Sequence, residues 1–299
     1  MRQDPFGNRR PGQPAGRPRR GFNPRLLILL LFAGYAVFYY ISNRTVDPFT
    51  GEKVLIDRNL SAEDEAALGL QAYQEILSQE QRVDGNTDVA RQINEIARRL
   101  VDKIDEVESA MAAERGLQAQ NFASEFNWEV TVLDSPQVNA FALPGGKMAL
   151  YTGLVPLAQN ADAMATLMGH ESAHALQRHG AQRLTEQKLV QIGQMAGAAS
   201  GMDAQQMQMV MAVYGYGRAL PYARKHETEA DEVGLMLMAA ACFDPREAVP
   251  LWERMSAASG GQASPEFAST HPNPGTRIAN LQALMPRALE YRERFCENP

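Results

Sequence analysis

Residues 170–174, with the sequence HESAH, combine the residue types and the spacing that a catalytic zinc site needs. At about 100° per residue, His170 and His174 lie one turn apart on one side of a helix. Two neutral imidazoles at this spacing can bind one tetrahedral zinc ion, while Glu171 can reach a water molecule in the open position of the metal. The alternative is a helix on which two histidines stand four positions apart by chance.

A third metal ligand would decide between these interpretations. In metzincins it is a histidine six positions after the second one, where this chain has Gly180, so that class of protease is excluded. His179 stands one position earlier and would lie about 140° around the helix from His174. We therefore expect a helix that continues to Gly180 and carries His179 as an exposed residue of its last turn.

A second helix, predicted to start near Pro221, offers the missing ligand in the segment HETEAD at 226–231. Glu227 can complete a set of two histidines and one glutamate, and Asp231 can accept a hydrogen bond from the second N–H of a ligand imidazole. Small residues on the same face would let the two helices approach closely. The alternative, by charge pattern alone, is that the segment forms an exposed acidic helix surface. We expect Glu229 to be exposed in this way.

The two segments resemble the HExxH and ExxAD motifs of the membrane-associated gluzincin peptidases. That family includes the CAAX prenyl protease, HtpX, the mitochondrial Oma-type proteases and BepA. Similar segments at 68–77, 138–154 and 269–281 extend the resemblance over about residues 60–285. Because only residues 26–43 could span a membrane, the resemblance favours the BepA-like periplasmic subgroup with a single anchor, here without its helical repeat domain.

The resemblance also implies a role for several single positions. Glu227 matches a metal ligand of the family, and Asp231 matches an aspartate that supports the ligands. His271 lies in a loop whose histidine can occupy the open position of the metal as an inhibitory ligand in BepA-like members. Arg277 matches an arginine that follows this loop, and either side chain could supply a second donor to the oxyanion.

The elements around these motifs indicate a mainly α fold with a small antiparallel β-sheet, of the α+β class. With 299 residues and 45% hydrophobic content, the chain can bury a sizeable core. The segments 61–77 and 86–109 have the apolar spacing of amphipathic helices, whereas 127–153 alternates around the turn signal PGG, which predicts a hairpin. By the resemblance, the substrate cleft contains a strand formed by Asn139, Ala140 and Phe141.

Residues 26–43 are uncharged and, at about 1.5 Å per residue, can just cross a thin bilayer as a transmembrane anchor. The formal charge of −6 divides into +6 for residues 1–25, from seven arginines and one aspartate, and −12 for the rest. We expect residues 1–25 to be a disordered basic tail, 44–59 a linker and 60–299 the peptidase domain. Bulky residues stand where signal peptidase would need small ones, so cleavage is not expected.

The arginine bias predicts a single-pass protein with its N-terminus in the cytoplasm. On this basis we expect a bacterial inner-membrane protein whose catalytic domain lies in the periplasm. The mitochondrial inner membrane is the alternative location, because the first 25 residues are rich in arginine and poor in acidic residues.

Together these features predict a membrane-anchored zinc endopeptidase. One zinc ion per chain, held by His170, His174 and Glu227, would activate water, and Glu171 would carry its proton to the leaving amine. The resemblance implies misfolded or misassembled envelope proteins as substrates, and we expect no nucleic-acid partner. The alternatives are a membrane-tethered chaperone or scaffold with a structural zinc, and a zinc hydrolase that does not cut proteins. The sequence specifies neither the natural substrate nor the oligomeric state.

Two further features stay open at the level of sequence. Cys242 and Cys296 lack the spacing of a zinc-ribbon or redox motif, but across a membrane they could form one disulfide. The methionine-rich segment 195–211 could pack as an ordinary helix, line a peptide groove or touch the membrane.

Overall fold

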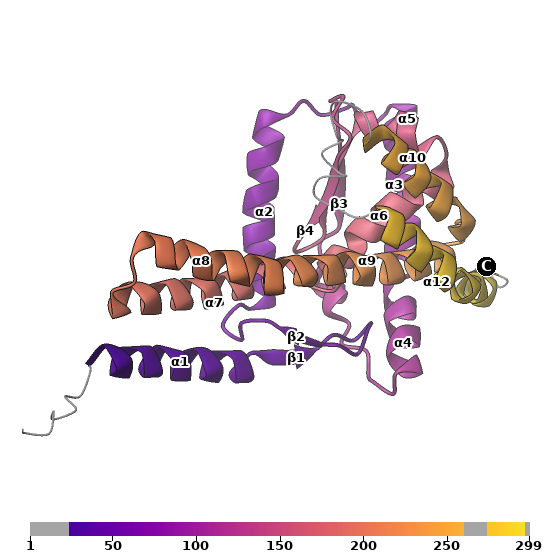
Figure 1. Cartoon of the computed structure of the whole chain (residues 1–299). Coiled ribbons are helices and arrows are strands. Elements are labelled where there is room, and N and C mark those ends of the chain that lie inside the picture. The colour runs from indigo at the N-terminus through magenta and orange to yellow at the C-terminus, as the bar shows by residue number, and fades with distance from the viewer. Residues whose placement is uncertain (1–23, 260–273, 297–299) are drawn as a thin grey trace, which may run out of the picture.

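The computed structural model describes residues 24–259 and 274–296, and helices predominate in it (Figure 1). The helices are α1 (Pro24–Ser42), α2 (Ala62–Gln79), α3 (Asp88–Val101), α4 (Ile104–Glu114), α5 (Val155–Ala158), α6 (Ala161–Leu176), α7 (His179–Ser200), α8 (Ala204–Tyr214), α9 (Leu220–Ala240), α10 (Ala248–Ser259) and α12 (Pro274–Cys296). The strands are β1 (Arg44–Val46), β2 (Lys53–Leu55), β3 (Glu129–Leu133), β4 (Ala140–Leu143) and β5 (Lys147–Tyr151). The expected fold class, mainly α with small sheets, is confirmed.

The larger sheet has the strand order β3-β5-β4. The predicted hairpin is present as the antiparallel pair β4–β5, and its turn places Gly145 and Gly146 at positive φ, which glycine adopts without strain. The sheet is nevertheless mixed, because β3 pairs parallel to β5. All five residues of β5 are buried, so this strand lies in the middle and takes β3 as its second neighbour.

Two layers of helix cover the larger sheet (Figure 1). The side chains of α2 pack on one face through Tyr73 and Leu77, which contact Leu133 and Ala149. The other face belongs to the main hydrophobic cluster, which also contains side chains of α3, α6, α9, α10 and α12. This cluster therefore surrounds the helix that carries HESAH, and every residue of that helix from 163 to 176 is buried.

The histidine helix ends at Leu176, so the expected continuation to Gly180 is wrong. Arg178 adopts a left-handed backbone conformation with φ of 55°, and α7 starts at His179 in a new direction. The Arg178 guanidinium donates a hydrogen bond to Glu65 of α2 at 3.0 Å and lies over the ring of Phe122. These contacts stabilise a conformation that is uncommon for a residue with a side chain.

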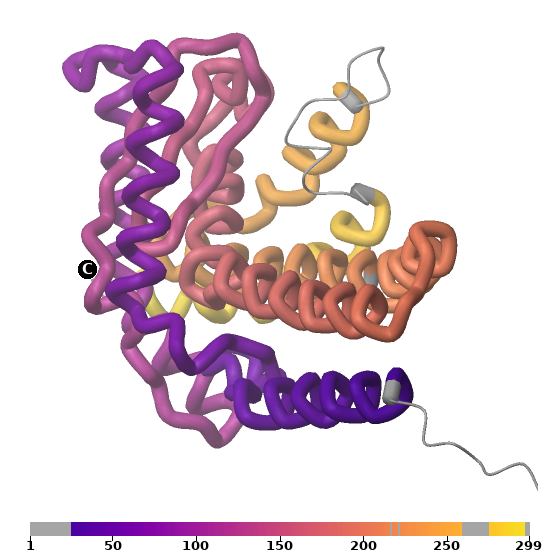
Figure 2. The backbone as a smooth tube through the Cα atoms, turned by 90° about the vertical axis from the view of Figure 1, so that its left-hand side faces the viewer, coloured from indigo at the N-terminus to yellow at the C-terminus, as the bar shows by residue number. Residues whose placement is uncertain are grey.

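The N-terminal helix lies outside this core, whereas the segment after it contributes Phe49 to the main hydrophobic cluster. Within α1, residues Arg25–Ser42 are long and apolar enough to cross a membrane, and Tyr39 is the one residue among them that is buried. Residues 44–59, expected to be a linker, contain the antiparallel pair β1–β2. Figure 2 shows α1 and the hairpin of α7 and α8 extending in the same direction from the rest of the molecule.

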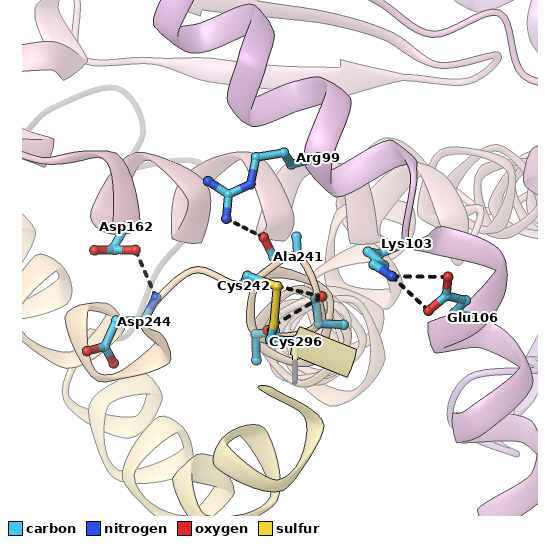
Figure 3. Close-up of a disulfide and its surroundings, with 10 residues drawn as sticks. Arg99, Lys103, Glu106, Asp162, Ala241, Cys242, Asp244 and Cys296 are labelled. Atoms are coloured by element: carbon cyan, nitrogen blue, oxygen red, sulfur yellow. Dashed lines mark hydrogen bonds and ion pairs between the residues drawn. A yellow bond between two sulfur atoms is a disulfide. The ribbon is translucent and has the colours of Figure 1, made fainter. Parts of the chain in front are cut away.

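A disulfide between Cys242 and Cys296 joins the C-terminal ends of α9 and α12 (Figure 3). The two Cα atoms are 5.6 Å apart, within the usual range for a disulfide. Arg99 of α3 donates a hydrogen bond to the carbonyl of Ala241 at 2.6 Å, beside the bridge. The pairing that the sequence left open is therefore present in the structure.

Candidate metal centre and active site

The metal ligands meet where α6 crosses α9, and two glycines make that crossing close. A Cβ atom added at Gly169 would lie 2.8 Å from the carbonyl oxygen of Gly234, and one added at Gly234 would lie 2.7 Å from the backbone nitrogen of His170. The helix backbones thus touch, as we expected from the small residues on α9. Glu227, two turns before Gly234, is thereby placed beside both histidines.

The three predicted ligands converge on one point. The Nε2 atoms of His170 and His174 are 3.1 Å apart, and the Glu227 carboxylate lies 3.4 Å from the first and 3.5 Å from the second. Ligands about 2.0–2.1 Å from a tetrahedral zinc ion are roughly 3.3 Å from one another, so these separations fit that metal. All three side chains are buried, and the structure identifies them as a group that could hold a metal ion.

Behind the ligands, Asp231 and Arg277 form a buried ion pair. The Asp231 carboxylate lies 3.1 Å from Nδ1 of His170, and Nη2 of Arg277 lies 2.9 Å from the same nitrogen. Arg277 donates hydrogen bonds to Asp231 at 2.7 Å and to Glu227 at 3.2 Å. Burial alone would raise the pKa of Asp231, but the charge and hydrogen bonds of Arg277 hold this pKa below its ordinary value.

The Arg277 side chain is only 2% exposed, and its guanidinium lies 3.5 Å from the centroid of the Trp252 ring. These contacts direct it toward the ligand carboxylates, an arrangement that orients Glu227 and Asp231. Its expected role as an oxyanion donor stays a prediction. His271 lies outside the described residues.

Glu171 is buried on α6, next to His170. The segment predicted to bind substrate comprises Asn139 and the first residues of β4, Ala140 and Phe141. Among the described residues, β4 has a strand partner on one side only, and it packs near α6. The structure therefore brings this strand to the zinc helix, while its role in binding stays a prediction.

A second cluster beside the ligands contradicts two expectations. His179 is fully buried rather than exposed, because the chain turns at Arg178 and directs it back toward α6. Glu229 is also buried, since α9 packs its acidic face inward, and burial raises the pKa of its carboxyl. Burial lowers the pKa of His179 to about 3 and that of His226 to about 2, so both imidazoles are neutral. No residue spacing indicated this cluster.

Comparison with known proteins agrees with this geometry. The sequence profile described as Peptidase family M48 matches residues 101–285. The chain belongs to this family. M48 peptidases are zinc-dependent, so the ligand set described above is that of a zinc metalloendopeptidase.

Proteins similar to this M48 peptidase include OMA1 metalloendopeptidases and a β-barrel assembly-enhancing protease. The mitochondrial metalloendopeptidase OMA1 of Schizosaccharomyces pombe is 33% identical over 268 residues, which cover 88% of this chain and 72% of that protein. Human OMA1 is 37% identical over 189 residues, which cover 59% of this chain and 36% of human OMA1. The β-barrel assembly-enhancing protease of Escherichia coli K12 is 27% identical over 177 residues, which cover 55% of this chain and 36% of that protein.

These relatives correct two finer expectations. OMA1 of Schizosaccharomyces pombe matches most of this chain, whereas the assembly-enhancing protease matches a shorter part of it at lower identity. The BepA-like subgroup is therefore not supported. The bacterial periplasmic location is not supported either, because the OMA1 relatives are named as mitochondrial.

Proposed function

We propose that this zinc endopeptidase cleaves misfolded or misassembled proteins of the membrane to which α1 anchors it. The proposal rests on the convergence of His170, His174 and Glu227 on one point. Asp231 and Arg277 form a hydrogen-bonded pair beside these ligands. The name of the assembly-enhancing protease supports a role in protein quality control. The names of the OMA1 relatives support a mitochondrial location, and with the membrane helix α1 we place the protein in the mitochondrial inner membrane, the alternative location.

A zinc ion held by His170, His174 and Glu227 would supply the Lewis acidity that polarises the scissile carbonyl and activates water. Glu171 accepts the proton from the water and delivers it to the leaving amine. Asp231 fixes the tautomer of His170 by accepting from its Nδ1, and Arg277 holds the Glu227 carboxylate in place. In our proposal His271 acts as an additional donor or as a regulatory ligand.

Substrate has two places to bind next to these groups. The open side of β4, with Asn139, Ala140 and Phe141 at its start, can hold an extended peptide by main-chain hydrogen bonds. A cavity of about 280 Å³ between α7 and α9 reaches Glu227 and is lined by Val190, Tyr214, Tyr222 and Ala223 among others. This largely apolar space suits a hydrophobic side chain, which an unfolded protein exposes.

The test compares the full-length protein, purified in detergent, with its Glu171→Gln variant. Degradation of an unfolded model protein and the zinc content are measured for both, and Glu253→Gln on the exposed side of α10 is the matched control. We expect the native and control proteins to cut, and Glu171→Gln to retain zinc while its rate falls at least 100-fold. Equal cutting by Glu171→Gln, or zinc-loaded native protein that does not cut, would contradict the proposal and favour the scaffold.

A further inference from the structure

Between Lys188 and Arg218 the chain carries a single charged residue, Asp203, which precedes α8. This stretch forms the second half of α7, all of α8 and the start of the π-helical turn η3 (Gly215–Ala219). Five of its large apolar side chains are exposed: Met195, Met202, Met209, Val210 and Val213, the last by 72%. A helical hairpin surrounded by water would carry charges on its outer face, so this surface is not suited to water.

The hairpin lies alongside the membrane helix. In Figure 1, α7 and α8 run parallel to α1, and α7 packs along it. The turn of the hairpin reaches the start of the apolar span, because a Cβ atom at Gly201 would lie 3.5 Å from the guanidinium carbon of Arg25. The tip of the hairpin and the start of the membrane span therefore lie at the same end.

At the opposite end, basic side chains lie against tyrosines of α1. The Lys188 ammonium is 5.5 Å from the ring centroid of Tyr39, and the Arg218 guanidinium is 5.8 Å from that of Tyr40. Tyrosine together with lysine or arginine marks the border between hydrocarbon and water in membrane proteins. From Lys188 to Gly201 the hairpin extends about 20 Å, which is about two thirds of a roughly 30 Å hydrocarbon layer.

We propose that the hairpin of α7 and α8 is inserted beside α1 into the same lipid bilayer, so that acyl chains cover its methionine and valine side chains. Its polar side chains are mostly glutamines, which can hydrogen-bond between helices within a bilayer; Gln194, for example, contacts the sulfur of Met211. The base of the hairpin adjoins His174 and Glu227. The active site therefore lies near the membrane surface, a consequence that for substrate choice rests on the proposed function.

The test uses the full-length protein in liposomes, with a bimane label on single cysteines introduced at Met209 or Val213 while the native disulfide stays closed. Leu68→Cys, on the exposed side of α2, is the matched control, because Leu68 is also a large exposed apolar residue. We expect brominated lipids to quench the labels at 209 and 213 several-fold more than the label at 68. Equal quenching at all three sites overturns the proposal. A blue-shifted but unquenched label also overturns it, since protein rather than lipid then covers the hairpin. Cleavage by the same samples reports separately on the proposed function.

A different observation concerns the second nitrogen of His174. Its Nε2 faces the metal position, and its Nδ1 is 2.8 Å from Nδ1 of His179. An imidazole that binds zinc through Nε2 carries its proton on Nδ1, so His174 donates and His179 accepts. The proton of His179 then stands on Nε2, which lies 3.6 Å from the Glu229 carboxylate.

We infer that His179 is a positioning residue that fixes the tautomer and the ring orientation of His174, with Glu229 behind it. The ring of His226 stacks on His179 at 4.1 Å and 12°, and so holds it in this orientation. His179, His226 and Glu229 also lie close enough together to hold a metal ion. Stacked rings, however, do not direct their nitrogen lone pairs at a common point, and the proton on His179 occupies the position that a metal would need. This inference rests on the zinc site of the proposed function.

The test compares His179→Asn with His179→Leu in the full-length protein. The amide oxygen of asparagine can replace the Nδ1 acceptor, whereas leucine cannot accept a hydrogen bond. We expect zinc affinity, measured by competition with a chelator, to fall 10–100-fold in His179→Leu and far less in His179→Asn. The absorption spectrum of the cobalt-substituted protein should shift in the same order. Equal losses in both variants, no loss in either, or two zinc ions per native chain would overturn the inference, and none of these readouts requires cleavage.

Discussion

Arg277 of α12 and Asp231 of α9 form a buried pair at 2.7 Å, which connects α12 to the helix that carries Glu227. Arg277→Lys keeps the charge but cannot donate to Asp231 and Glu227 in the same planar geometry. We expect a 10–100-fold lower zinc affinity and a loss of about 3 kcal/mol of stability, because Asp231 is left buried and poorly paired. Chelator competition and thermal unfolding measure the two effects.

The control for this change is Arg287→Lys on the same helix. Arg287 pairs with Glu232 and Glu114 at a partly exposed surface, where ion pairs contribute little. The interpretation of Arg277 as the residue that orients the ligands fails if both lysine variants bind zinc as the native protein does.

The contact of Gly169 with Gly234 predicts that Gly234→Ala is harmful. Its added Cβ would lie 2.7 Å from the backbone nitrogen of His170, so α6 and α9 must separate. We expect a loss of about 1–3 kcal/mol in unfolding free energy and weaker zinc binding, as the ligands move apart. Gly193→Ala is the matched control: it meets no atom within 4 Å on α7 and should stabilise by up to about 1 kcal/mol. Unchanged zinc affinity in Gly234→Ala would show that the crossing tolerates separation.

The ligand set could be predicted from the sequence because it depends on short helical spacings. His170 and His174 share a face of α6 in any fold that keeps this helix, and Glu227 and Asp231 likewise share a face of α9. The fold class followed for a similar reason, since apolar periodicity is local.

Features that depend on distant contacts could not be predicted. The parallel pairing of β3 with β5 joins strands that are not neighbours in the chain. The burial of His179 follows from a left-handed residue, Arg178, which is stabilised by Glu65 more than a hundred positions earlier. The same holds for the disulfide, because the distance between two cysteines is a property of the folded α9 and α12.

The buried Asp47 predicts a pH dependence of stability. Burial raises its pKa to about 6, although hydrogen bonds from Phe49 and Thr50 oppose the shift. Between about pH 4 and 6 the folded chain binds more protons than the unfolded chain, so this contribution is present at low pH and is lost as pH rises through 6. Asp47→Asn should therefore be more stable than the native protein at pH 7.5, by up to about 3 kcal/mol, and about equal to it at pH 4.

Urea unfolding at a series of pH values measures the difference between the two proteins, and the exposed Asp88→Asn is the control. A difference that does not vary with pH would mean that Asp47 titrates alike in both states.

The bridge between Cys242 and Cys296 closes a loop with a sequence separation of 54. Its removal should cost about 4 kcal/mol by the loss of constraint on the unfolded chain. We expect a reducing agent to lower the melting temperature of the native protein to that of the Cys242→Ser, Cys296→Ser double variant, which itself should not respond. A native protein indifferent to reductant would show that the bridge is absent in solution or contributes nothing.

The hairpin of α7 and α8 occupies the chain between His174 and Glu227, and both of its ends are fixed by the catalytic core. Because it leaves the core and returns to the same place, residues can be added or removed at its tip without displacing either ligand. In the bilayer-inserted arrangement that we propose, a change in the length of the hairpin would alter its fit to the thickness of the bilayer and leave the metal ligands in place.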